Sequence, residues 1–228
     1  MLSFVVPLIA LSAYFHFQFN FTLKETAKLN LIVIAESQRN TVDLFLQERV
    51  VNIFSLFHSL DFSLAPTRRT MENYLRNLRR VSDAFIDVGF LNAGGIQIGY
   101  AGPFPNLQNK DYTNEKWFLT LMQQDRHYYI SDIYLGFRNK PHFTIAVKQR
   151  IDGKFYAVRS TLDPDKFYIF LRTINRGKGV NSVLINNQGS YQVVDPDSGK
   201  LFGLSDLTPS NPTGSGVQEI NKNGDTIL

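Results

Sequence analysis

The residues best suited to hold a small molecule lie in the middle of the chain, where the only Trp occurs among several Tyr, Phe, Arg and His. Tyr112, Trp117 and Tyr134 could form an aromatic wall that stacks on an apolar or cationic ligand. Arg138 could hold an anion with its fork of N–H donors, and His142 could contact one in a pH-dependent way. These residue types predict a binding site for an organic acid, an amine or an amino-acid-like molecule.

Asp132 adds an acidic group to this set, and it would pair either with a ligand amine or with Arg138. The sequence leaves structural alternatives open. Trp117 would equally suit the core face of an amphipathic helix, together with its neighbour Phe118. Arg138 would suit an exposed hairpin tip, and His142 would suit a hydrogen-bonded structural position.

Nothing in the sequence is typical of an enzyme or a metal site. The histidines at positions 16, 58, 127 and 142 form no HxH or HxxxH pair, and no nucleophile–base motif is present. The absence of Cys excludes disulfides, Cys-ligated metals and Cys nucleophiles. We therefore expect no catalytic residue, no metal and no cofactor.

The charge of the chain does not favour nucleic-acid binding. The formal net charge is +4, and the basic residues are spread along the chain. Their one local cluster consists of Arg68, Arg69, Arg76, Arg79 and Arg80. No recognisable nucleic-acid-binding module accompanies it, so we expect no nucleic-acid partner.

The N-terminal segment, residues 1–21, is predicted to be a transmembrane helix. Residues 2–21 carry no formal charge and have about the length that spans a bilayer, with aromatic residues towards the far end. A cleaved signal peptide is the alternative, but it should begin with basic residues and end in a small-residue cleavage site. We therefore expect a bacterial inner-membrane protein whose remaining residues face the periplasm or exterior.

Residues 22–62 are predicted to be a stalk helix, because no Gly or Pro interrupts them. An apolar stripe runs along this helix at steps of four and three: Val42, Leu46, Val50, Ile53, Phe57 and Leu60. Such a stalk could pack on its own domain and on a second subunit, which predicts a homodimer through the N-terminal helix. A helix that merely covers a core would have the same periodicity.

Residues 63–176 are predicted to form an α+β domain with a five-stranded antiparallel sheet and helices on its faces. Thr67 is a suitable N-cap for a helix to about Val81, and a second helix is expected at 114–124. Strands are expected at 84–91, 96–101, 128–135, 142–149 and 154–162. Asp163-Pro164 then begins a helix to about Ile174. Residues 177–228 open a second unit with a hairpin at 180–186 and 190–195, and this unit is expected to be incomplete.

Three blocks of this sequence resemble a known family: DYTNEKWF (111–118), YISDIYLGFRNKPHFTIAV (129–147) and SVLINNQGSYQVVDPDSGKLFG (182–203). They are similar to the extracytoplasmic double-Cache sensor domain of bacterial transmembrane receptors, most closely that of sensor histidine kinases. The resemblance implies a PAS-like membrane-distal Cache domain at 63–176 and the start of a membrane-proximal one at 177–228. It also implies that this chain is the N-terminal fragment of a longer receptor.

In the amino-acid-binding branch of this family, a Tyr, an Arg, a Trp-Tyr pair and a later Asp contact the ligand. Tyr112, Trp117 and Phe118 match the aromatic part, which adds Phe118 to the candidate ligand-binding residues. Glu115 or Lys116 stands where the Arg is expected, and Thr161 falls near the expected Asp. Both charged anchors are therefore missing or altered, which disfavours amino-acid binding and leaves the ligand open.

The function that the resemblance implies is ligand sensing by a transmembrane receptor, with a histidine kinase of a two-component system as the expected output. Any kinase activity would belong to parts of the parent protein outside this chain, so the chain itself is not expected to be an enzyme. A methyl-accepting chemotaxis receptor or a cyclic-dinucleotide enzyme could carry the same sensor. A membrane-anchored interaction module without a small ligand is a further alternative.

Overall fold

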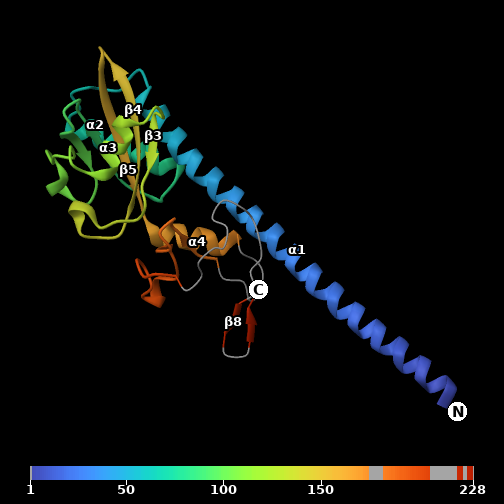
Figure 1. Ribbon diagram of the computed structural model, residues 1–228. Helices are drawn as coiled ribbons and strands as arrows, with labels where there is room; N and C mark the ends of the chain where they lie inside the picture. Colours follow the sequence, from blue (N-terminus) through green and yellow to red (C-terminus); the bar gives the residue numbers. More distant parts are fainter. Residues whose placement is uncertain (1, 175–181, 206–219, 223–224, 228) are drawn as a thin grey trace. The chain divides into compact units, whose positions relative to one another are not determined.

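The computed structural model describes residues 2–174, 182–205, 220–222 and 225–227 (Figure 1). Residues 2, 3, 174, 220–222 and 225–227 are described by their backbone alone. The chain divides into two compact units, one of Val42–Leu207 and one of Met1–Thr41 with Thr208–Leu228. The predicted domain boundary at 176 and 177 lies outside the described residues.

Helix α1, Leu2–Phe57, is continuous through the predicted transmembrane and stalk segments. By length and composition alone, it is the one helix among the described residues that could cross a membrane, and its most apolar window is not buried. Near the other end of the chain, β8 (Ile220–Lys222) and β9 (Asp225–Ile227) pair as a short antiparallel hairpin.

The larger unit contains the five-stranded antiparallel sheet that the sequence predicts. Its strands are β1 (Phe85–Leu91), β2 (Gln97–Ala101), β3 (Tyr128–Ile130), β4 (Phe143–Ile151) and β5 (Lys154–Leu162). Their order is β2-β1-β5-β4-β3, with β5 in the centre. The prediction of a long N-terminal helix with an α+β, PAS-like sheet is therefore confirmed.

Alternation of side chains along the central strands gives the sheet two different faces. In β5, Val158 and Leu162 belong to the larger apolar cluster, whereas Arg159 and Thr161 bond with polar residues on the other side. Successive strand residues point to opposite faces, so a single strand can serve an apolar core and a polar site at once.

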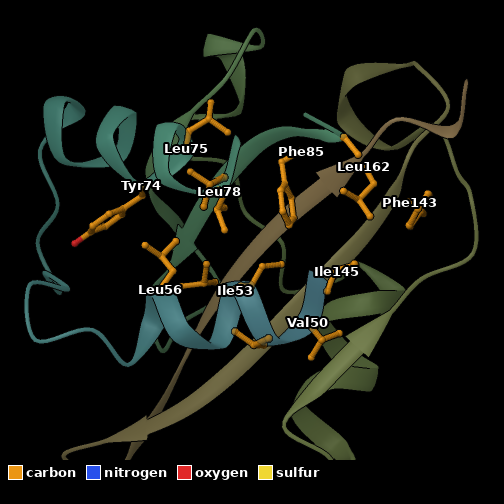
Figure 2. Packing of buried hydrophobic residues seen from close by; sticks show 14 of the residues in the cluster. Val50, Ile53, Leu56, Tyr74, Leu75, Leu78, Phe85, Phe143, Ile145 and Leu162 are labelled. Carbon is orange, nitrogen blue, oxygen red and sulfur yellow. The ribbon is translucent and has the colours of Figure 1, made fainter. Parts of the chain in front are cut away.

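The apolar face is covered by helices. The last turns of α1 and helix α2 (Arg68–Val81) pack on it (Figure 2). Helix α4 (Pro164–Ile174) adds Phe167 and Leu171 to the same cluster. The buried residues of α2 are those of its predicted apolar face: Met71, Tyr74, Leu75 and Leu78. Thr67 caps α2 as predicted, because its hydroxyl accepts the Thr70 N–H at 3.2 Å. Ile53 of α1 is completely buried in this core.

The opposite face carries a smaller cover. Helix α3, Lys116–Gln123, buries Trp117, Phe118 and Leu121 against this side of the sheet in a second cluster. Two short 3-10 helices, η1 (Pro105–Leu107) and η2 (Gly136–Arg138), occur in the loops of this region. This lighter cover leaves space for a polar network.

Several expectations need correction. Strand β3 ends at Ile130 instead of 135, because the Ser131 hydroxyl accepts the Thr144 N–H and replaces a carbonyl of the ladder. Leu60 is fully exposed, since α1 ends at Phe57 before reaching it. The hairpin expected within residues 180–195 is present as β6 (Leu184–Ile185) and β7 (Tyr191–Val193), both shorter than expected, and it belongs to the larger compact unit.

Candidate functional site

Asp87 of β1 is the centre of a buried polar network. The register of β1 and β5 places Asp87 opposite Thr161, whose hydroxyl donates to Asp87 Oδ1 at 2.7 Å. The Tyr100 hydroxyl donates to Oδ2 at 3.2 Å. Asp87 is completely buried, so its charge depends on these partners and on nearby cations.

Arg159 and Arg138 are the cations that neutralise this carboxylate. Arg159 donates from Nη1 to Asp87 at 3.3 Å and from Nε to Gln97 at 2.8 Å. Arg138 donates from Nη2 to Asp87 at 2.8 Å and from Nη1 to Thr161 at 2.9 Å. Gly89 makes room for this arrangement, since a Cβ at that position would collide with the Gln97 side-chain oxygen.

The electrostatics of the network favour the charged forms of Asp87 and Arg159. Burial alone would raise the pKa of Asp87, but the attraction of Arg159 and Arg138 and the bonds from Thr161 and Tyr100 outweigh it and keep that pKa below its ordinary value. Burial would likewise lower the pKa of Arg159, and the attraction of Asp87 more than compensates. Two guanidinium groups share one carboxylate, so these ionised side chains leave one positive charge in excess.

A small cavity adjoins this network. Its free volume is about 10 Å³, about the room of one water molecule. It is lined by Leu107, Tyr112, Glu115, Tyr134, Phe137, Arg138, His142 and Arg159. Tyr112 accepts a hydrogen bond from Arg159 Nη2 at 3.0 Å and packs edge-on against Phe137. The cavity therefore has two cations, one anion and an aromatic wall.

His142 lines the cavity as a neutral ring. Its Nδ1 lies 2.8 Å from the Lys140 carbonyl oxygen, which can only accept, so Nδ1 carries the proton and Nε2 is an acceptor. Burial, reinforced by the nearby charge of Arg138, lowers the pKa of His142 to about 4. At neutral pH His142 therefore offers the cavity a lone pair and not a positive charge.

The structure brings together four of the predicted ligand-binding residues: Tyr112, Tyr134, Arg138 and His142. Arg138 is buried and ion-paired, so the alternative of an exposed hairpin tip is wrong. Trp117 and Phe118 are instead buried in the second apolar cluster and do not line the cavity.

Asp132 is not part of this cavity, which corrects the sequence expectation. It is exposed and accepts a hydrogen bond from Asn186 Nδ2 at 3.2 Å. The expected pairing with Arg138 is not formed, because Arg138 is paired with Asp87 instead. The early end of β3 before Asp132 removes this residue from the sheet.

Sequence reasoning missed Asp87, Arg159 and Phe137. Asp87 and Arg159 stand in strands whose other residues are mostly apolar, and a charge in such a strand needs a buried partner. The need of each charge for a buried partner could therefore have predicted the pairing of Asp87 with Arg159. Phe137 gave no such signal, because an aromatic residue in a loop is common.

Comparison with known proteins shows what this fold is similar to. No family model and no curated protein matches the chain. The sensory domain of the Campylobacter jejuni chemoreceptor Tlp3 with isoleucine bound is similar in structure, with a TM-score of 0.65 and 12% identity over 90% of this chain and 87% of that one. The ligand-binding domain of the Pseudomonas aeruginosa chemoreceptor PctC with GABA has a TM-score of 0.61 and 16% identity, covering 85% and 88%.

A third solved structure is an extracellular ligand-binding receptor from Desulfohalobium retbaense, with a TM-score of 0.60 and 12% identity. The match covers 74% of this chain but spans only 31% of the length of that receptor. The fold is therefore that of Cache-type extracellular sensor domains. At these identities the likeness establishes the fold alone.

Proposed function

We propose that this chain is the ligand-sensing region of a membrane-anchored receptor and that it binds a small charged molecule beside Arg138 and Arg159. The observation that carries the proposal is the cavity itself. It joins two buried guanidinium groups, a carboxylate and an aromatic wall on one face of a Cache-type sheet. The similar chemoreceptor domains hold isoleucine and GABA, which supports a ligand of this size and polarity.

In this proposal α1 anchors the chain in the bacterial inner membrane, with the larger unit in the periplasm or outside the cell. Its apolar, exposed N-terminal part supports the anchor, and its last turns pack on the sheet beside which the ligand binds. A ligand with a higher affinity for one packing of the sheet against α1 would shift the equilibrium towards that packing. This shift would move α1 relative to the same helix of a dimer partner.

The output of the parent protein is part of the same proposal. The resemblance of its sequence blocks supports a sensor histidine kinase, and the likeness to chemoreceptor domains equally supports a methyl-accepting chemotaxis receptor. In both cases catalysis or adaptor binding would belong to segments outside this chain.

A thermal-shift experiment on the full chain in detergent micelles tests ligand binding. The screen uses organic acids, amines and amino acids, and a true ligand should raise the unfolding temperature increasingly with its concentration. Phe137→Ala should weaken the shift, because Phe137 lines the cavity and is 41% exposed, so its loss should leave the fold intact. Leu135→Ala, an exposed apolar residue outside the cavity, is the matched control.

A membrane-anchored interaction module without a small ligand is the second candidate. The observation that favours it is the small free volume of the cavity, about 10 Å³. If no compound in the screen stabilises a correctly folded chain, this second function replaces the first.

A further inference from the structure

A groove lies between helix α2 and strand β2 of the larger unit. Its volume is about 840 Å³, far more than that of the cavity in the candidate functional site, and the two share no lining residue. Met71 and Leu75 of α2 are among its apolar lining residues, and β2 contributes residues 98–101. The groove is therefore a second concave surface of this domain, with an apolar lining of its own.

Strand β2 lies at the edge of the sheet, and its outer side pairs with no other described strand. At its start, Gln97 donates its backbone N–H to the Lys110 carbonyl and accepts from the Asn109 N–H, both at 2.9 Å. Further along, the Ile98 carbonyl accepts the side-chain amide of the exposed Gln108 at 2.8 Å. A strand edge of this kind is a template on which another extended chain can pair.

Helix α2 surrounds the groove with positive charge. It contains five arginines and a single acidic residue, Glu72. Its formal excess of +4 equals the net charge of the whole chain. Arg68, Arg76 and Arg79 line the groove, and Arg68 is paired with Glu72 at 2.9 Å. The lining thus has more guanidinium groups than carboxylates to neutralise them.

Arg76 and Arg79 have no carboxylate partner among the described residues. Arg76 is exposed, and its side chain forms no hydrogen bond or ion pair within that part of the chain. Arg79 donates from Nε to the Phe85 carbonyl at 3.0 Å and from Nη2 to the Ile86 carbonyl at 2.7 Å. These bonds hold its guanidinium group in place and leave about three of its five N–H donors for an anion.

The spacing of the arginines favours an extended chain over a small molecule. Arg68 and Arg79 are separated along α2 by about 16 Å, at a rise of 1.5 Å per residue. An extended segment of about five residues has the same length, and its alternate side chains point to one side. Carboxylates at alternate positions could therefore lie along the arginines while the side chains between them contact the apolar lining.

We propose that this groove is a docking site for an extended acidic segment of a partner protein. The segment pairs with the outer edge of β2 and places its carboxylates beside Arg76 and Arg79. Gln108 then releases the Ile98 carbonyl to a backbone N–H of the segment, since its exposed side chain can turn into solvent. This docking does not depend on the proposed ligand binding and gives the sensor region a second input.

Fluorescence anisotropy with labelled octapeptides tests this docking on the full chain in nonionic detergent micelles. The salt concentration is about 150 mM, so that exposed charges are screened beyond about 8 Å. The probe alternates Glu and Val. One comparison peptide alternates Gln and Val, and another has its Glu residues in one half and its Val residues in the other. The alternating Glu-Val probe should bind at least about fivefold more tightly than either comparison peptide.

Arg76→Glu should weaken binding of the Glu-Val probe at least about tenfold. An exposed ion pair contributes up to about fivefold in affinity, and this variant replaces it with a repulsion of similar size. Arg80→Glu is the matched control, because Arg80 is an exposed arginine of the same helix that does not line the groove. It should change the affinity less than about twofold.

N-methylation of the probe tests the pairing with β2. The N–H groups of successive strand residues point to opposite edges. Methylation of either all Glu or all Val nitrogens should therefore abolish binding, and methylation of the other set should not. If both methylated probes still bind, the segment does not pair with β2 and the proposal is overturned.

Two further results would also overturn the docking site. Equal weakening by Arg76→Glu and Arg80→Glu, or equally tight binding of inorganic polyphosphate or duplex DNA, would indicate a general anion-binding surface. The absence of binding at millimolar probe, to a chain whose Trp117 fluorescence shows it to be folded, would contradict docking outright. Small-molecule sensing is measured separately by the thermal-shift screen, so each proposal can fail without the other.

Discussion

On one face of the five-stranded sheet, β1, β4 and β5 pack apolar side chains against α1, α2 and α4. On the other face the same strands carry Asp87, Thr144, Arg159 and Thr161, all buried and all polar. The apolar face gains free energy from each buried group separately. The polar interactions of the other face contribute little net free energy to folding. Removing one of these side chains, however, leaves a buried charge or hydrogen-bond donor of its partner unpaired.

This difference assigns separate tasks to the two faces. Burial of side chains such as Ile53, Phe90 and Ile145 supplies the stability of the domain. That stability allows the opposite face to hold two guanidinium groups and a carboxylate at a cost in desolvation. The proposed binding site would be selective, because its charges are already fixed in position before a ligand arrives.

The largest effect is expected from Asp87→Asn, which leaves Arg138 and Arg159 buried without their shared counter-ion. Breaking a buried ion pair from one side costs about 3–5 kcal/mol in the free energy of unfolding. Urea unfolding of the full chain, followed by Trp117 fluorescence, measures this loss. Asp83→Asn is the control, since Asp83 pairs with Lys166 at the surface and should matter little. If both variants lose the same free energy of unfolding, the buried ion pairs of the polar face stabilise the fold no more than an exposed surface pair does.

The next effect, on the apolar face, is expected from Ile53→Ala in α1. Ile53 is completely buried against the sheet, and removing its side chain should cost about 2–5 kcal/mol through lost burial and a cavity. Val51→Ala on the same helix is the control, because Val51 is 58% exposed. The same unfolding experiment checks both variants. A negligible loss for Ile53→Ala would contradict the assignment of the last turns of α1 to this core.

The apolar face was also the more predictable of the two. Periodicity alone indicated the buried residues of α2, and the Thr67 cap and the Asp163-Pro164 pair indicated where two of the helices begin. These signals are local, because they depend on spacing within one helix or one turn. The antiparallel pairing of the five strands agrees with the prediction, although only β5 has the predicted ends.

The polar face could be predicted only in part. Tyr112, Tyr134, Arg138 and His142 share one cavity, as their chemistry suggested. The partner of Arg138 is Asp87, and this contact depends on the register of β1 with β5 and on the path of η2. Arg138 lies in a loop segment, so its sequence context contains no signal for this pairing. Asp132 illustrates the same limit, because the sequence offered it as a partner of Arg138, whereas it is exposed and accepts a hydrogen bond from Asn186.

Acid should affect the two faces differently, because His142 belongs to the polar one. The pKa of His142 is about 4 in the fold against an ordinary 6.5, so between these pH values the unfolded chain binds a proton that the folded chain does not. The free energy of unfolding should therefore be highest above pH 6.5 and fall by up to about 3 kcal/mol towards pH 4. Asp87, with a lowered pKa, would add its own loss only below the ordinary carboxyl range.

Urea unfolding across this pH window measures the effect of His142. His142→Asn keeps a donor for the Lys140 carbonyl and should flatten the dependence. His127→Asn, which removes an exposed histidine, should leave the slope unchanged. If the free energy of unfolding of His142→Asn depends on pH as steeply as that of the unchanged chain, the pH dependence belongs to another group.

The smallest effect tests how far the polar face acts as one unit. Thr161→Val keeps the shape of the side chain but removes a hydroxyl that donates to Asp87 and accepts from Arg138. These two residues remain in direct contact, so we expect a loss of only about 1–2 kcal/mol in the free energy of unfolding. Thr120→Val on α3 is the control, because its hydroxyl donates to a backbone carbonyl in the same helix and should contribute less.

A double mutant that combines Thr161→Val with Asp87→Asn should lose less free energy of unfolding than the sum of the two single losses, since Thr161 acts through Asp87. Additive losses would mean that the hydroxyl and the carboxylate stabilise the sheet independently.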